Sequence, residues 1–129
     1  MPWARKSDRG AAVVDFALIM VLLIPLVLGI IQVGIVLHVR NTMAAAASEG
    51  ARRAASLDGN PAEGSALAQR IISDAVSSRY ATKVTAHDAL VVGVPGVVVR
   101  ARAEVPALGL WGPTMSIDVT GHAVKEVLP

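Results

Sequence analysis

Few residues in this chain of 129 could do chemistry, and one carboxylate is distinguished by its position. Asp15 lies at the front edge of a long apolar segment, five residues after Gly10. A carboxylate near hydrocarbon costs free energy, so it is expected either to have a use or to mark the boundary of the segment. Both interpretations of Asp15 remain open from the residue alone.

The histidines are weaker candidates. His38, His87 and His122 are far apart, and no pair has the spacing of metal ligands. His87 would need a serine nucleophile, but no nucleophile-elbow pattern surrounds any serine. The absence of cysteine excludes a disulfide and a thiolate metal site. We therefore predict no enzymatic activity, no metal, no cofactor and no small-molecule substrate, and interpret the histidines as surface residues.

A helix must position Asp15. Residues 16–37 contain no charged side chain, and Gln32 is the only strongly polar one. At about 1.5 Å per residue, a helix of this length covers roughly 33 Å and can cross a bilayer core. A buried core helix would normally be shorter and carry a polar stripe. The pattern therefore predicts a single transmembrane helix.

A cleaved secretory signal is the main alternative for this segment. Arg5, Lys6 and Arg9 precede the apolar run, and the run Ala44–Ala47 imitates a cleavage site. However, the apolar region of a signal peptide is only about 7–15 residues long, so we favour a retained span. Basic residues flank both ends of the span. The tight front cluster and the short front tail favour an N-terminus in the cytoplasm.

Three residues within the span have special backbone properties. Pro25 predicts a kink, because proline removes a helical hydrogen bond. Gly29 and Gly34 allow another helix to approach closely. Glycine and proline are also simply more frequent in membrane helices, so this second explanation remains open.

The rest of the chain predicts a small α+β unit. The alanine-rich residues 38–57 continue the first helix as a stalk, on which Glu49 is spaced to pair with Arg52 and Arg53. The sequence LDGNP breaks this helix. A second helix follows over 61–80, with Asn60 as its N-cap, Pro61 at its first position and Glu63 completing a capping-box-like pattern. Its apolar stripe comprises Leu67, Ile71, Ala75, Ala68, Ile72 and Val76.

Alternation of apolar and polar residues predicts three strands after residue 82. We place them at 84–92, at 97–105 and from Met115 to Thr120, the last interrupted by Gly121. Pro95 and Gly96 are expected at the centre of a turn, and 106–113 as a loop. The predicted fold class is α+β: a long N-terminal transmembrane helix extending into a stalk, a second helix and a small antiparallel three-stranded sheet.

The net charge of +2 is small and the basic residues are scattered, which argues against a nucleic-acid partner. The predicted organisation is a basic leader at 1–10, the transmembrane helix and stalk at 11–57, and an extracytoplasmic α+β domain at 58–129.

The front edge of the span resembles the N-terminus of a type IV prepilin. A basic leader ends in Gly10, four mostly apolar residues follow, and Asp15 and Phe16 open the apolar helix. More narrowly, residues 9–55 look like the TadE-like family of minor pseudopilins of the tight-adherence (Flp) pilus. The likeness runs along Gly10, Phe16, Pro25, Gly29, Gly34 and the alanine-rich stalk. The family usually has glutamate at the position of Asp15.

This resemblance implies that a prepilin peptidase cuts between Gly10 and Ala11. The new amine of Ala11 would then lie one helical turn from Asp15, which could neutralise it in the same chain or in a neighbouring subunit. The resemblance also implies a non-enzymatic role in pilus assembly in the cytoplasmic membrane, with other pilins, a secretion ATPase and platform proteins as partners. A membrane-anchored or secreted binding domain unrelated to pili is the alternative.

Overall fold

The computed structural model describes residues 3–106 and 114–129, with side chains from residue 8 onward. The side chains of Arg5 and Lys6 and most of the loop expected at 106–113 therefore lie outside the described residues. The chain divides into two compact units, Met1–Gly34 and Ile35–Pro129, and each is described by itself.

A single helix, α1 (Trp3–Ala55), contains both the predicted span and the predicted stalk. Pro25 lies inside it, and the helix continues on both sides of this proline. The stalk ends where the Ser56 hydroxyl and backbone N–H turn back to the carbonyl of Arg53. Gly59 follows, and a Cβ atom at that position would collide with this same carbonyl. The break predicted at LDGNP is confirmed.

The second helix, α2 (Pro61–Ala75), begins as predicted. The Asn60 side chain accepts a hydrogen bond of 2.9 Å from the backbone N–H of Glu63, so it caps the helix. The predicted extension to Tyr80 is wrong. Both Val76 and Ser77 donate to the carbonyl of Ile72, which closes the helix, and a short 3-10 helix, η1 (Ser78–Tyr80), follows.

The sheet contains three antiparallel strands in the order β1-β2-β3, as predicted. They are β1 (Lys83–Val91), β2 (Val94–Pro106) and β3 (Thr114–Val124). Alternate residues of β2 from Val97 to Val105 are buried, and the residues between them face outward. The described chain is therefore α+β, with a long apolar N-terminal helix, a second helix and a three-stranded antiparallel sheet.

The first turn of the sheet differs from the prediction. Pro95 and Gly96 lie within β2, and the turn is formed by Val92 and Gly93 instead. Both residues have positive φ, 51° for Val92 and 79° for Gly93. Such a two-residue turn twists in the same sense as the flanking strands, which explains why it replaces the Pro-Gly turn.

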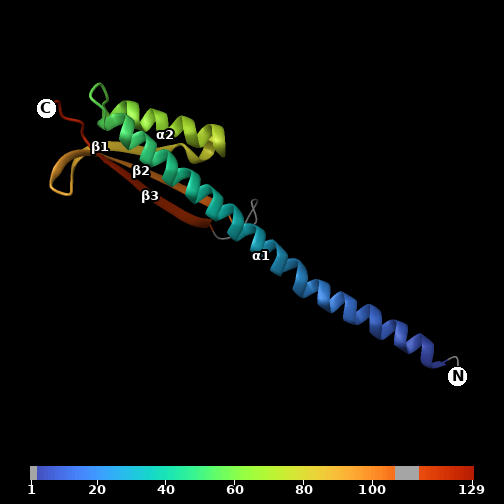
Figure 1. The fold of residues 1–129 in the computed structure, drawn as a ribbon. Helices are drawn as coiled ribbons and strands as arrows, with labels where there is room; N and C mark the ends of the chain where they lie inside the picture. Colours follow the sequence, from blue (N-terminus) through green and yellow to red (C-terminus); the bar gives the residue numbers. More distant parts are fainter. Residues whose placement is uncertain (1–2, 107–113) are drawn as a thin grey trace. The chain divides into compact units, whose positions relative to one another are not determined.

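Within the second unit, the helices cover one face of the sheet (Figure 1). The core joins α1, α2 and all three strands, and no polar side chain is buried among the residues that the structure describes. Its largest fully buried side chains are Met43, Ile72, Val39, Val97, Val99 and Val105.

Glycines bring the backbones of these elements into direct contact. A Cβ atom on Gly50 of α1 would lie 2.5 Å from the Gly64 carbonyl oxygen of α2, and the reverse contact is also 2.5 Å. Gly121 lies against the backbone of Ala47 and Ser48 in the same way. Gly121 therefore does not interrupt β3, contrary to the prediction; it permits the strand to touch α1.

Substituting Gly50 tests this contact. Gly50→Val should destabilise the second unit by about 1–3 kcal/mol or more, because the added atoms meet backbone that has no room to move. The measurement is thermal unfolding of the full chain in detergent micelles, followed by the β-sheet signal in circular dichroism. Ala45→Val, on the exposed face of α1, is the control. Equal midpoints for the two variants would contradict the proposed backbone contact.

Candidate functional site

The front edge of the span is described as regular, exposed helix. Gly10, Ala11 and Asp15 all belong to α1, and all three are exposed. Residues four apart in a helix lie on the same face, about 6 Å apart along the axis. The helix therefore places Asp15 one turn after Ala11, in the arrangement expected from the sequence.

Asp15 has no ion-pair partner among the side chains that the structure describes, from residue 8 onward. Its neighbours Val14 and Phe16 are exposed apolar side chains, 56 % and 62 % accessible. A carboxylate at this position is open to a cation supplied by another chain or by a new chain terminus. The site can thus hold a positive charge.

The segment after Asp15 is an uncovered apolar surface. Large side chains are exposed all round the helix from Val13 to Leu37, including Leu22 at 75 %. Within the part of the chain that the structure describes, this is the one helix long and apolar enough to cross a membrane. Exposed apolar surface of this extent requires lipid or other apolar helices around it. The helix is consistent with a single membrane anchor.

Pro25 and Gly29 lie beside one shallow hollow on this helix, together with Leu26, Ile30 and Val33. A Cβ atom at Gly29 would meet nothing within 4 Å, and the same holds for Gly34. Gly34 does not line the hollow. The structure thus brings together two of the three residues predicted for packing. The space beside them is open to a neighbouring helix or to lipid.

A second polar cluster lies on the outer face of the sheet, where the sequence analysis proposed no site. Arg100 of β2 donates from Nε to Asp118 Oδ1 of β3 over 2.9 Å, and also donates from its Nη2 to Oδ2. Arg102 donates from Nε to the same Oδ2 over 3.1 Å. The only sequence signal for this cluster is the outward alternation of β2 and β3, and the strand register is needed to pair the residues.

These contacts shift the ionisation of both partners. The hydrogen bonds from Arg100, together with the nearby positive charges, hold the pKa of Asp118 below its ordinary value, although partial desolvation opposes this shift. The hydrogen bond to Asp118 correspondingly raises the pKa of Arg100. Asp118 is therefore a fixed negative charge between two arginines at neutral pH.

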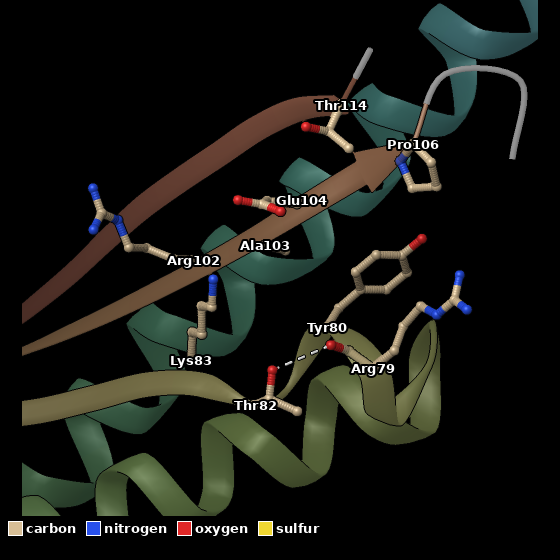
Figure 2. Close-up of a pocket in the computed structure, with 9 residues that line it drawn as sticks. All are labelled: Arg79, Tyr80, Thr82, Lys83, Arg102, Ala103, Glu104, Pro106 and Thr114. Carbon is tan, nitrogen blue, oxygen red and sulfur yellow. Dashed lines mark hydrogen bonds between the residues drawn. The ribbon is translucent and has the colours of Figure 1, made fainter. Parts of the chain in front are cut away.

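A shallow hollow lies beside this cluster (Figure 2). It is lined by side chains from η1, from the start of β1 and from the end of β2, and it opens widely to solvent. Its charged residues are Arg79, Lys83, Arg102 and Glu104. No group of three or more potential metal ligands occurs among the described residues. The hollow is shallow, and three of its four charged lining residues are basic.

Of the two arginines expected to pair with Glu49, Arg52 does so and Arg53 does not. Arg52 lies 3.8 Å from Glu49, as the helix spacing predicts. Arg53 instead pairs with Glu63 of α2 over 3.0 Å. The packing of α1 against α2 brings this acid within reach, and Glu63 therefore serves an interhelical pair in addition to its backbone contact with Asn60. The three histidines are exposed, as predicted.

Comparison with protein families identifies the first third of the chain. Residues 10–52 match the family model described as TadE-like protein. The resemblance noted from the sequence is confirmed over this range: residues 10–52 are a TadE-like family domain. No curated protein and no solved structure matches the chain.

The Asp118 cluster predicts a specific acid sensitivity. Because the folded-state pKa of Asp118 is lowered, its contribution to stability is fully present above the ordinary carboxyl pKa of about 3.9 and is lost as pH falls through the folded value. The fall in thermal midpoint between pH 7 and about pH 3 should be smaller in Asp118→Asn than in the unmodified chain. Asp58→Asn, at an exposed acid, is the control. An equal fall in all three proteins would contradict the assigned role.

Proposed function

We propose that this chain, with its TadE-like domain at residues 10–52, is a non-enzymatic pseudopilin-like membrane protein that takes part in assembly of a tight-adherence (Flp) pilus. The family match is the observation that carries the proposal, because it covers Gly10, the apolar span and the stalk together. TadE-like proteins are generally non-enzymatic, and the proposal assigns no catalytic residue.

In this proposal a prepilin peptidase cuts the chain between Gly10 and Ala11. Gly10 is exposed in the structure, so no other described part of the chain covers the proposed cleavage site. Glycine lowers helix stability by about 1 kcal/mol relative to alanine, so Gly10 weakens the helix next to the bond to be cut. The family match begins at the same glycine, which supports its assignment as the last residue of the leader.

Cleavage would give Asp15 a partner. The new ammonium group of Ala11 would lie one turn before the carboxylate, and Asp15 has no ion pair with any other described side chain. The positive end of the helix dipole adds to this attraction. The same carboxylate can instead bind the amine of a neighbouring subunit, which would align two spans in one register.

We place the protein in the cytoplasmic membrane as a single-pass protein with its N-terminus in the cytoplasm and residues 58–129 outside. The basic leader supports this orientation. The proposed partners are the prepilin peptidase, other pilins or pseudopilins, and the platform proteins and ATPase of the pilus machine.

The packing of α1 argues against release of the domain by signal cleavage. A cut at Ala44–Ala47 would remove Val39 and Met43 from the core, where both are almost fully buried. The freed fragment would also begin inside the α1 surface that Gly121 touches. A secreted domain made in this way would lose part of its own hydrophobic core.

Substitution of Gly10 tests the cleavage site. Gly10→Leu should block processing, because a bulky side chain would stand directly beside the bond to be cut. The mass and N-terminal sequence of membrane-extracted protein from cells with an active prepilin peptidase report the result. Gly29→Leu is the control in the same helix and should be processed normally. An unmodified chain that still starts at Met1 in these cells would remove this part of the proposal.

Substitution of Asp15 tests the charge pair. Asp15→Ala should reduce the number of pili by about tenfold or more, since a loss near 1.4 kcal/mol already has this effect on an equilibrium. Asp15→Glu keeps the charge and should assemble pili at nearly the normal level. Pili are counted by electron microscopy, and the membrane level of each variant is measured alongside. Equal piliation with alanine and glutamate would show that the carboxylate only marks the membrane boundary.

A further inference from the structure

We propose that Arg79, Lys83 and Arg102 form a site for the phosphate groups of anionic phospholipids, at the surface of the membrane that α1 crosses. The proposal rests on the membrane anchor and does not depend on the pilus role. It assigns a ligand to the hollow in Figure 2, which the proposed function leaves unexplained.

The three cations come from separate elements and line one hollow, where Figure 2 shows the Lys83 ammonium between the outward-directed guanidinium groups of Arg79 and Arg102. Lys83 lies directly opposite Arg102 in the register of β1 and β2, and like charges in this arrangement repel each other. Arg102 is partly neutralised by Asp118. Lys83 and Arg79 form no ion pair with any side chain in the described part of the chain. An anion bound beside Lys83 would relieve this repulsion.

Glu104 is the one acid among the described residues that line the hollow, so the hollow has a net positive charge. Arginine also suits the ligand, because its planar guanidinium binds two phosphate oxygens at once. Lysine adds a compact charge on a flexible stem that can follow a mobile headgroup.

Tyr80 lines the same hollow and has two contrasting ends. Its ring packs against the hydrophobic core, and it is half-buried. Figure 2 shows its hydroxyl group directed away from η1, on the same side of the hollow as Pro106. Tyrosine is enriched at membrane–water interfaces because it combines an apolar ring with a polar tip. Tyr80 and Arg79 together have the composition of an interfacial anchor.

The hollow lies at the end of the second unit where Ile35 begins it. At the opposite end, Val97 packs with Ala54 and Ala55, and the Glu126 N–H donates to the Ala55 carbonyl. From Val97, β2 runs back along α1 toward Pro106. On the way, Val99 pairs with Gly121 of β3, which lies against Ala47 of α1. Figures 1 and 2 show the Pro106 end of β2 beside the teal part of α1, which precedes residue 50.

Chain connectivity joins this end to the anchor. Ile35 belongs to the apolar run 16–37, so the end of the second unit that contains the hollow follows the span without an intervening linker. Attraction between basic residues and anionic lipids extends over a Debye length of about 8–10 Å. Arg40, exposed on α1 shortly after the span, adds a further cation at this end. A tethered site also meets the lipid at high effective concentration.

The test uses the full chain in lipid nanodiscs. The sequence has no cysteine, so Thr82→Cys at the hollow accepts a single fluorophore. Quenching by lipids with a spin label on the headgroup reports contact with the membrane surface. We expect about twofold stronger quenching in discs with phosphatidylglycerol than in discs of phosphatidylcholine alone, and a decrease of this difference in about 0.5 M salt.

Matched charge removals locate the effect. The double variant Arg79→Gln and Lys83→Gln should abolish the difference between the two lipids. The control is the double variant Arg52→Gln and Arg70→Gln, which also removes two exposed positive charges. It should keep the difference in quenching between the two lipids. Arg70 lines a hollow with Arg53 and Glu63, toward the Ala55 end of the unit.

Equal quenching in both lipids would overturn the proposal, and so would an equal loss in the two double variants. If lipid composition has no effect but the Arg79 and Lys83 variant loses cross-links to another pilus subunit in cells, the cations recognise an acidic protein instead, and the lipid proposal is wrong. The nanodiscs contain no pilus machinery. A negative nanodisc result therefore contradicts only the lipid proposal. The Gly10 and Asp15 variants test the proposed function separately.

Discussion

Direct backbone contact between α1 and its two neighbours is the constraint on which the second unit depends. Gly50 and Gly64 let the two helices touch through their carbonyl groups, and Gly121 lets β3 rest on the backbone of Ala47 and Ser48. A methyl group at any of these three glycines would push the elements apart and open the core. The close approach fixes the distance between the sheet and α1, whereas the alternation of side chains along each strand decides which residues face outward.

The local features of this fold were predictable, whereas the contacts between elements were not. Uninterrupted apolar sequence, the Asn60 cap and the alternation in β2 each act over a few residues and were correctly interpreted. Local signals predict the turn at Pro95 and Gly96, whereas the twist of the paired strands selects Val92 and Gly93. The pairing of Arg53 with Glu63 required the packing of α1 on α2, which no spacing rule contains.

The two candidate sites also differ in whether they depend on local sequence or on contacts between elements. Gly10, Ala11 and Asp15 lie on one helix, so their relation follows from sequence spacing alone. Arg79, Lys83 and Arg102 come from η1, β1 and β2, and only the register and the end of α2 bring them together. A prediction that extended α2 through Tyr80 would have placed Arg79 on a helix face. The 3-10 turn instead places it at the rim of the hollow.

Side chains of α1 are large in the apolar span and smaller in the stalk that packs against α2 and β3. The exposed residues before Gly34 are mainly leucine, isoleucine and valine, while alanine is the commonest residue of the stalk. Small side chains allow α2 and β3 to approach the stalk closely, and large side chains would prevent it. In the span, large side chains instead increase contact with lipid tails or with neighbouring spans. One continuous helix can therefore serve as the core of a domain and as an anchor, because the two tasks require different residue sizes and occupy different segments.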